Sequence, residues 1–208
     1  MPTSDVVTTI PWSTPERLEY RLVDNGGKDL GTGTLAVERS SEGFTLSSSF
    51  QSETSKDDST VVVDALTLKP ISSRRQIVTK DDDETIEVQY TDQGAVIKQG
   101  DKQSGLSVPE HSYDNDSSLW LWRTIDLHEG FEASYTTIIT NRRSRQTVNL
   151  RVTGKQSVTV PAGTFDAWRV EVRTSNARQI AWIADTPQRT LLKYDNDRNV
   201  IFELTSKP

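Results

Sequence analysis

Apolar and polar side chains alternate along most of this chain, with the period of two that is typical of strands buried on one face. The first such run places Leu18, Tyr20 and Leu22 between Glu19 and Arg21. Further sets with this period are Phe44, Leu46, Ser48 and Phe50; Ile86, Val88 and Tyr90; Phe131, Ala133, Tyr135 and Ile139; Val148, Leu150 and Val152; Trp168, Val170 and Val172; Ile180, Trp182 and Ala184; and Val200, Phe202 and Leu204. The pattern predicts an all-β chain of roughly ten to thirteen strands.

Turn-forming sequences separate these runs and follow one another closely along the chain. They are Asn25-Gly26-Gly27, Asp92-Gln93-Gly94, Pro161-Ala162-Gly163 and Asp195-Asn196-Asp197. Such spacing predicts a wide antiparallel meander. A flat sheet of that width would leave its apolar face in water, and twisted sheets of more than about ten strands curl or split. We therefore expect a barrel, a half-barrel or a sandwich formed by a single β domain over residues 16–208.

Two segments depart from the alternation. Residues 1–15 are rich in Pro, Thr and Ser, which predicts a linker-like N-terminal segment of loose order. Residues 117–126 begin with residues that cap helices and continue as LWLWRTID, which favours one short helix that could plug the open end of a curled sheet. The competing interpretation of this second segment is a strand with Trp120 and Trp122 on one face.

The hairpin over residues 158–173 is the clearest local prediction. Pro161 fixes φ in its turn, and Gly163 can adopt a positive φ. Beyond the turn, Val170 and Val172 are expected to face the core, whereas Arg169, Glu171 and Arg173 are expected to face water.

Composition narrows the class of protein. Apolar residues make up 33% of the chain, a low share that suits strands with one wet face. A protein with a net charge of −6 repels phosphate backbones, so we do not expect general nucleic-acid binding. The basic clusters Arg74-Arg75 and Arg142-Arg143-Ser144-Arg145 are expected to be solvated hairpin tips.

Compartment signals are mostly absent from this sequence. It has no cysteine, which excludes disulfides and thiolate chemistry. It also contains no run of about 18 apolar residues, so we expect no transmembrane segment. No signal peptide is recognisable in the residues that follow Met1.

The sequence predicts no catalytic residue, metal site or cofactor. His111 and His128 lack a nucleophile elbow or a partner pattern, and His111 is expected to belong to a polar loop. Asp114-Asn115-Asp116 and Asp195-Asn196-Asp197 begin like calcium loops, but they lack the later Gly and Glu and are predicted to be Asx-rich turns. The acidic run over residues 81–84 is expected to be a solvated tip.

Several segments, taken in order, resemble a known bacterial family. They read LEYRLVDNGGKDLGTGTL, VVVDALTLKPISSRR, SLWLWRTIDLHEGF, VTVPAGTFDAWRVEV, ARQIAWIADTPQRTLLKY and FELTS. Together they resemble the domain-of-unknown-function family numbered three-one-zero-eight, from about Leu18 to Ser206. The resemblance implies exported or lipid-anchored envelope proteins, with a sheet curled into an unclosed barrel similar to the lipoprotein-carrier fold. It therefore implies an extracytoplasmic location, in the periplasm or cell envelope.

Two function classes follow from this combination. The first is a non-enzymatic envelope protein that binds a lipid or another apolar or amphipathic molecule inside the curled sheet. The second is a scaffolding module with a filled core, whose partner is another envelope protein. Core packing is the first expectation for Trp168 and Trp182. For the ligand-binding class, the side chains expected to line the site are Tyr20, Trp120, Trp122, Phe131 and Trp168.

Overall fold

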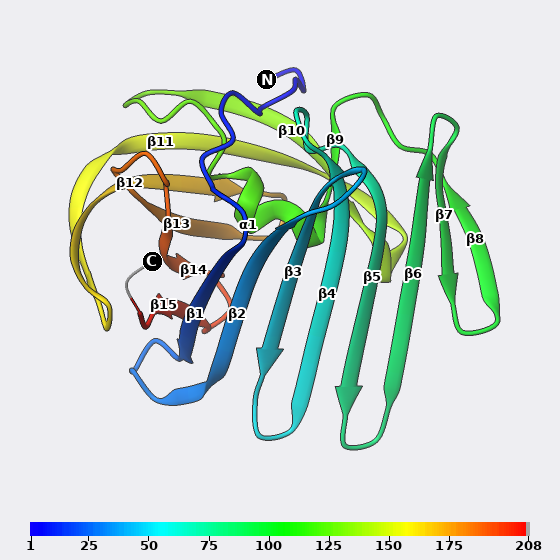
Figure 1. The fold of residues 1–208 in the computed structure, drawn as a ribbon, viewed down its shortest axis with the longest axis horizontal. Coiled ribbons are helices and arrows are strands. Elements are labelled where there is room, and N and C mark those ends of the chain that lie inside the picture. Colours follow the sequence, from blue (N-terminus) through cyan, green and yellow to red (C-terminus); the bar gives the residue numbers. More distant parts are fainter. Residues whose placement is uncertain (207–208) are drawn as a thin grey trace.

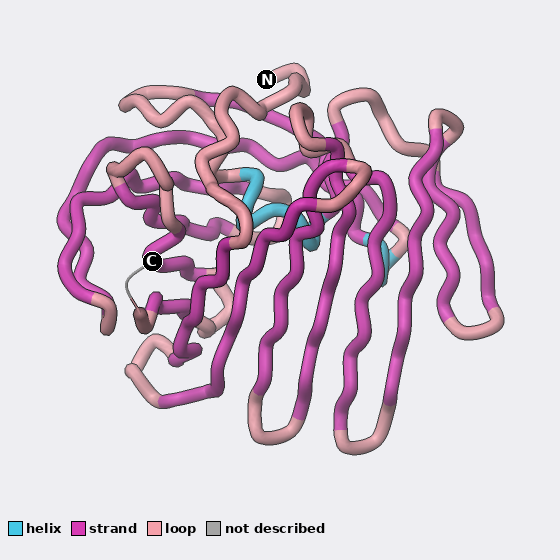
Figure 2. The backbone as a smooth tube through the Cα atoms, viewed as in Figure 1, coloured by secondary structure: helices cyan, strands magenta, loops and turns pink. Residues whose placement is uncertain are grey.

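The computed structural model describes residues 1–206, which form one sheet of 15 strands with a short helix inside its curve (Figure 1). The strands are β1 (Glu16–Val23), β2 (Asp29–Arg39), β3 (Gly43–Gln51), β4 (Ser55–Asp64), β5 (Pro70–Thr79), β6 (Asp83–Thr91), β7 (Gly94–Gln99), β8 (Lys102–Leu106), β9 (Ser112–Asp114), β10 (Glu132–Ile139), β11 (Ser144–Val160), β12 (Gly163–Arg173), β13 (Arg178–Ala184), β14 (Leu191–Asp195) and β15 (Ile201–Leu204). The helical elements are η1 (Asn115–Ser117), α1 (Ser118–Leu121) and η2 (Thr140–Arg142). Figure 2 shows that strands account for most of the chain.

The chain starts in the middle of the sheet and visits both edges. It runs from β1 outward to β8 at one edge, crosses to β9 at the other, and returns strand by strand to β15, which pairs with β1. All neighbouring strands are antiparallel except β9 and β10. Within residues 1–206 no backbone pairing joins β8 to β9, so the sheet curls without closing. The prediction of an antiparallel meander forming an unclosed barrel is confirmed.

Curling buries the apolar face of the sheet in two clusters. The larger one fills the curve between β1–β4 and β10–β15 and contains α1. The smaller one lies where the β6–β7 hairpin meets β10, with Ile86, Val88 and Ile97 packed around Ile138. The alternation of apolar and polar residues lets the sheet bury one face and expose the other. In β1, for example, Leu18 and Tyr20 are each 1% exposed while Glu19 between them is exposed.

The predicted helix exists but is short. Its α-helical part ends at Leu121, and a 3₁₀ turn precedes it, so only part of the segment 117–126 is helical. The hydroxyl of Thr124 donates a 2.7 Å hydrogen bond to the Leu121 carbonyl, and the fully buried Arg123 binds Glu16 through both terminal nitrogens. This local hydrogen bond and the long-range ion pair hold the chain after Leu121 in turns rather than in a longer helix.

The N-terminal segment contains no helix or strand, but it is packed rather than loose. Val6 and Trp12 are buried, at 2% and 6% exposure. The backbone N–H groups of Thr8 and Thr9 both donate to the Thr124 carbonyl, at 2.9 and 3.1 Å. The segment therefore crosses the helical plug, and the expectation of loose order for residues 1–15 does not match the structure.

The hairpin over residues 158–173 forms as expected around its turn, where Gly163 has a φ of 137°. Val170 and Val172 are buried in the core. Glu171 faces outward, yet it is 5% exposed because Arg169, Arg173 and Arg178 surround its carboxylate. Hydrogen bonds from Arg178 and Arg169 lower the pKa of Glu171 to about 2.

For β13, the period-two pattern predicts the wrong position for Trp182. Ala181 and Ile183 are the fully buried side chains of this strand, whereas Trp182 lies on the outer face, half-buried. Its ring is 5.8 Å from Lys193 Nζ, and it pairs across the sheet with Arg169. The size of a tryptophan favours the core, but this ring is only partly buried at the edge of the core, with the Lys193 cation above it.

Candidate functional site

A cavity of about 390 Å³ lies inside the curve of the sheet, lined from both halves of the chain and from η1 and α1. We divide its principal lining into three groups. The aromatic wall is Phe50, Trp122, Tyr135, Tyr194 and Phe202; the polar wall is Ser48, Asp57, Ser59, Arg75 and Asp116; the mouth residues are Asn141, Arg142, Asn176, Asn196 and Arg198. The volume falls within the range of about 300–1,000 Å³ that is typical of small-molecule sites.

The aromatic wall is a continuous run of ring contacts. Phe50 packs edge-on against Phe202 with 5.1 Å between ring centroids, Phe202 lies 5.2 Å from Tyr194, and Tyr194 lies 5.5 Å from Trp122. The Trp122 indole N–H donates a 3.0 Å hydrogen bond to the Tyr135 hydroxyl, which fixes both rings. This wall offers an ordered apolar surface on one side of the cavity.

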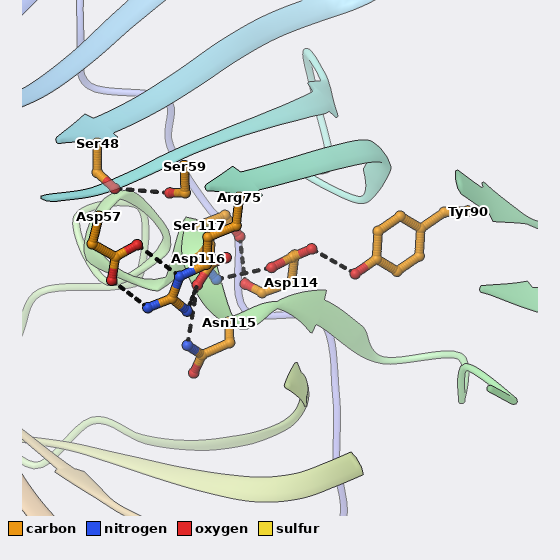
Figure 3. A network of polar contacts seen from close by, with 9 residues as sticks. All are labelled: Ser48, Asp57, Ser59, Arg75, Tyr90, Asp114, Asn115, Asp116 and Ser117. Atoms are coloured by element: carbon orange, nitrogen blue, oxygen red, sulfur yellow. Dashed lines mark hydrogen bonds and ion pairs between the residues drawn. The ribbon is translucent and has the colours of Figure 1, made fainter. Parts of the chain in front are cut away.

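The polar wall is organised by Arg75, which lies in the middle of β5. Its Nε and Nη2 donate to the two carboxylate oxygens of Asp57 on β4, at 2.8 and 2.6 Å, and its Nη1 donates to Asp116 on η1 at 3.1 Å (Figure 3). Nearby, the hydroxyls of Ser48 and Ser59 are 2.8 Å apart. Arg75 thus ties two strands of the sheet to the turn that carries α1.

A second buried carboxylate lies behind this ion pair. Asp114 is fully buried; its Oδ2 accepts a 2.6 Å hydrogen bond from the Tyr90 hydroxyl and its Oδ1 accepts the Asp116 backbone N–H at 2.9 Å (Figure 3). Burial raises the pKa of Asp114, although the hydrogen bond from Tyr90 opposes this. Burial and the neighbouring Asp114 carboxylate raise the pKa of Asp116 to about 7, against the opposing charge of Arg75.

One expectation about these residues needs correction. The sequence predicts Arg75 in a solvated hairpin tip, but its side chain is only 21% exposed and it binds two carboxylates. The segment 114–116 forms the predicted Asx turn, and the side chains of Asp114 and Asp116 are buried. Of the basic cluster at 142–145, Arg142 and Arg143 lie in the turn that joins β10 to β11 and Arg145 lies at the start of β11, and all three are exposed.

Two buried polar side chains of the lining lack a partner within residues 1–206. Trp120 is 1% exposed and its Nε1 makes no hydrogen bond; Thr137 is 2% exposed and its Oγ1 makes none. A buried polar group without a partner costs about 1–3 kcal/mol. Both atoms are inaccessible to water, so they lie within the packed wall of the cavity rather than on its open surface.

The structure brings together only some of the five side chains expected at a ligand site. Trp120 and Trp122 line the cavity, whereas Tyr20, Phe131 and Trp168 do not. Tyr20 lies behind the aromatic wall, where its hydroxyl donates to the Leu191 carbonyl at 2.8 Å. Phe131 packs 5.7 Å from the exposed His128 at the start of β10.

Trp168 lies at the rim of the core, not inside it. It is half-buried, its Nε1 donates a 2.9 Å hydrogen bond to Asp185, and Lys155 Nζ lies 4.5 Å from the ring centroid. A polar partner for the indole and a cation over its face explain this position.

Each of the two histidines lies beside an aspartate, His111 beside Asp5 and His128 beside Asp126. His111 Nδ1 lies 3.3 Å from Asp5 Oδ1, and the hydroxyl of the adjacent Ser112 has no hydrogen-bond partner within residues 1–206. In the same part of the chain no group of three or more His, Asp or Glu side chains could hold a metal ion. The helices of residues 1–206 are also too short to cross a membrane.

A second hollow of about 530 Å³ lies over β1–β4, lined by residues such as Thr32, Thr34, Ser49 and Thr60. Ala36 is its one apolar lining residue, and no aromatic side chain lines it. Small-molecule sites are mostly apolar, so the interior cavity is the better candidate although its volume is smaller.

Comparisons with known proteins place the chain in a family and support the fold. A family model described as Protein of unknown function (DUF3108) matches residues 17–200, and no curated protein matches. A crystal structure of a β-barrel-like protein of domain of unknown function DUF1849 from Brucella abortus is similar, with a TM-score of 0.63, 11% identity, and coverage of 92% of this chain and 96% of that one. That similarity concerns the fold alone.

Two more distant structures cover 98% of this chain and 99% of their own. One, from Bacteroides fragilis, is described as a "putative exported protein" (8% identity, TM-score 0.34). The other, from Parabacteroides distasonis, is described as a "putative lipoprotein" (13% identity, TM-score 0.36).

Proposed function

The chain belongs to the DUF3108 family of proteins of unknown function, and from that premise and the cavity we propose that it is a non-enzymatic protein that binds an amphipathic small molecule inside its curled sheet. The observation that carries the proposal is the cavity of about 390 Å³, which is lined by both aromatic and polar side chains. Tyr20, Phe131 and Trp168 are not part of the proposed site; Trp120 and Trp122 are.

The two walls argue for a ligand with two kinds of surface. The aromatic wall favours contact with apolar groups. The hydroxyl and charged groups of the polar wall favour contact with polar groups. A purely apolar ligand would leave the polar wall unused, and a purely polar one would leave the aromatic wall unused.

Replacing a residue of the cavity lining by a larger one tests this proposal. Val172 is fully buried and lines the cavity, so Val172→Phe should occupy ligand volume. The matched control is Val96→Phe, because Val96 is 40% exposed on β7 and does not line the cavity. Calorimetric titration with dodecanoate is expected to show binding to the unaltered protein and to Val96→Phe, with at least about tenfold weaker binding to Val172→Phe.

Equal binding to both variants, with unchanged circular dichroism spectra, would show that dodecanoate does not use the cavity. Overpacking of the core is the other effect of Val172→Phe, so the unfolding midpoint of each variant should be measured alongside.

A second candidate function is the scaffolding role, and it is favoured by one observation. β8 is an end strand of the sheet and pairs only with β7, so one side of its backbone is open to another chain. Under that role a partner protein would protect the amides of β8 from hydrogen exchange, and dodecanoate would not bind.

We also propose an extracytoplasmic location, which rests on the resemblance of the sequence to exported and lipid-anchored envelope proteins. Fractionation of the host cells followed by immunoblotting should place the protein in the periplasm or envelope fraction. Recovery in the cytoplasmic fraction alone would refute this location.

A further inference from the structure

We propose that the mouth of the cavity binds the anionic head group of an amphipathic ligand, with Arg142 and Arg198 as its cationic contacts. This inference rests on the proposed function, because it assumes that the rest of the ligand occupies the cavity. The ligand class that it names is an amphiphile with one acidic head group, such as a carboxylate or a phosphate ester.

Arg142 and Arg198 differ from the other cation of the lining in having no partner. Arg142 belongs to η2 and Arg198 to the loop between β14 and β15, and both are exposed residues that line the cavity. Within residues 1–206 neither side chain forms an ion pair, whereas Arg75 is bound to two carboxylates. The cavity therefore has two available positive charges at its mouth.

No acidic side chain near the mouth is paired with these arginines. Asp57 and Asp116 are the carboxylates of the lining, and both are engaged by Arg75. The next acids along the β14–β15 loop, Asp195 and Asp197, accept backbone N–H groups of Asp197 and Arg178 respectively. Both guanidinium groups are therefore free to donate hydrogen bonds to an anionic group at this position.

The amide side chains at the mouth also present donors. Asn196 Oδ1 already accepts the backbone N–H groups of Arg198 and Val200, at 2.8 and 3.1 Å, and Asn176 Oδ1 lies 3.0 Å from the Ser175 hydroxyl. With both oxygens occupied, the two Nδ2 groups remain to donate. Guanidinium and amide donors together match an acceptor-only group such as a carboxylate or phosphate.

The mouth residues lie next to the aromatic wall in the same cavity, and this arrangement sets the orientation of a bound amphiphile. Arg198 and Tyr194 both line the cavity, and Tyr194 packs against Phe202 and Trp122. A head group held by Arg198 would therefore place an attached apolar chain along the aromatic wall.

The test compares head groups and arginines at constant chain length. Calorimetry would measure binding of dodecanoate, dodecyltrimethylammonium, acetate and inorganic phosphate, with both amphiphiles kept below micelle formation. The double variant Arg142→Gln/Arg198→Gln removes the two charges. Its matched control is Arg74→Gln/Arg151→Gln, which removes two charges from side chains that are 54% and 61% exposed and do not line the cavity.

We expect dodecanoate to bind at least about tenfold more tightly than dodecyltrimethylammonium, and the mouth variant to lose about tenfold in affinity for dodecanoate while the control loses less than about twofold. The preference for dodecanoate should weaken with added salt. Equal affinity for both amphiphiles, or equal losses in the two double variants, would overturn the inference while leaving the proposed function intact.

Acetate or phosphate binding as tightly as dodecanoate would refute the proposed function and keep only an anion site at the mouth. If none of the four probes binds, both the proposed function and the anionic head group are refuted.

Discussion

Arg75 holds the polar wall together, and replacing it by methionine should destabilise the fold. Arg75→Met keeps the length and apolar stem of the side chain but removes three hydrogen bonds, those to both oxygens of Asp57 and to Asp116. The carboxylates would then remain in the interior without their cation, beside the fully buried Asp114.

The magnitude follows from the burial of the partners. Removing one member of a fully buried pair costs about 3–5 kcal/mol, and an exposed pair contributes about 0–1 kcal/mol. The side chains of Arg75 and Asp57 are 21% and 27% exposed, and that of Asp116 is 9% exposed, so the site lies nearer the buried limit. We expect a loss of about 2–3 kcal/mol at pH 8, which for a chain of this size corresponds to about 5–10 °C in Tm.

Urea unfolding followed by tryptophan fluorescence and circular dichroism measures this loss. Arg74→Met is the matched control, because Arg74 is the preceding residue of β5, is 54% exposed, and lies 3.9 Å from Glu87. The control should change stability by less than about 0.5 kcal/mol. If the two variants are equally stable, Arg75 does not organise the polar wall and the reasoning from its burial is wrong.

Three other substitutions test separate features. Burial raises the pKa of Asp116 from 3.8 to about 7, so the folded state binds the proton of this carboxyl more tightly than the unfolded state does. This proton binding stabilises the folded state fully below about pH 4, and the stabilisation is lost as the pH rises through about 7. The Tm of the unaltered protein relative to Asp116→Asn should therefore fall between pH 4 and 7, and parallel Tm curves would contradict this. Trp168→Ala should cost about 1–2 kcal/mol in urea unfolding, because the ring is half-buried, and a loss of about 4 kcal/mol or more would mean that it is core. Gly31→Ala should lower the free energy of unfolding by more than about 2 kcal/mol, because φ is 137° and a Cβ would lie 2.0 Å from the Gln51 carbonyl oxygen. In the control Gly105→Ala the added Cβ meets nothing within 4 Å, so its stability should be nearly unchanged. Equal unfolding midpoints for the two variants would refute this prediction.

The period-two pattern predicts the class of fold because burial of one face is its direct cause. Sets such as Leu18, Tyr20 and Leu22 face the core as predicted. The prediction is wrong for Trp182 of β13, which is half-buried on the outer face, whereas Ala184 of the same alternating set is buried, beyond a register irregularity at Trp182 and Ile183. Ala181 and Ile183 are the core residues there, and side-chain size alone does not identify them.

The polar wall is not predicted by the alternation of apolar residues, although the same pattern contains part of the signal. Val61 and Val63 of β4 face the core, and continuing their parity backward places Ser59 and Asp57 on the same inner face. On β3, Leu46, Ser48 and Phe50 continue inward in the same way. Polar residues at inward positions of these strands mark the interior cavity.

Other parts of the site could not be predicted from local sequence. Arg75 meets Asp116 across 41 positions of sequence, and this contact exists only because the connection after β8 carries β9 and η1 back inside the sheet. Arg142 and Arg198 come from loops that are far apart in the chain, one before β11 and the other after β14. The two arginines line one cavity only because the sheet curls and brings their loops together.

Whether the curled sheet holds a small amphipathic molecule can be measured by native mass spectrometry of protein purified from its own host. We expect a bound species of added mass in the unaltered protein and in Val96→Phe, and we expect it to be reduced or lost in Val172→Phe. A single mass equal to that of the polypeptide, found in all three proteins under conditions that preserve a known protein–lipid complex, would show that the sheet holds no such molecule.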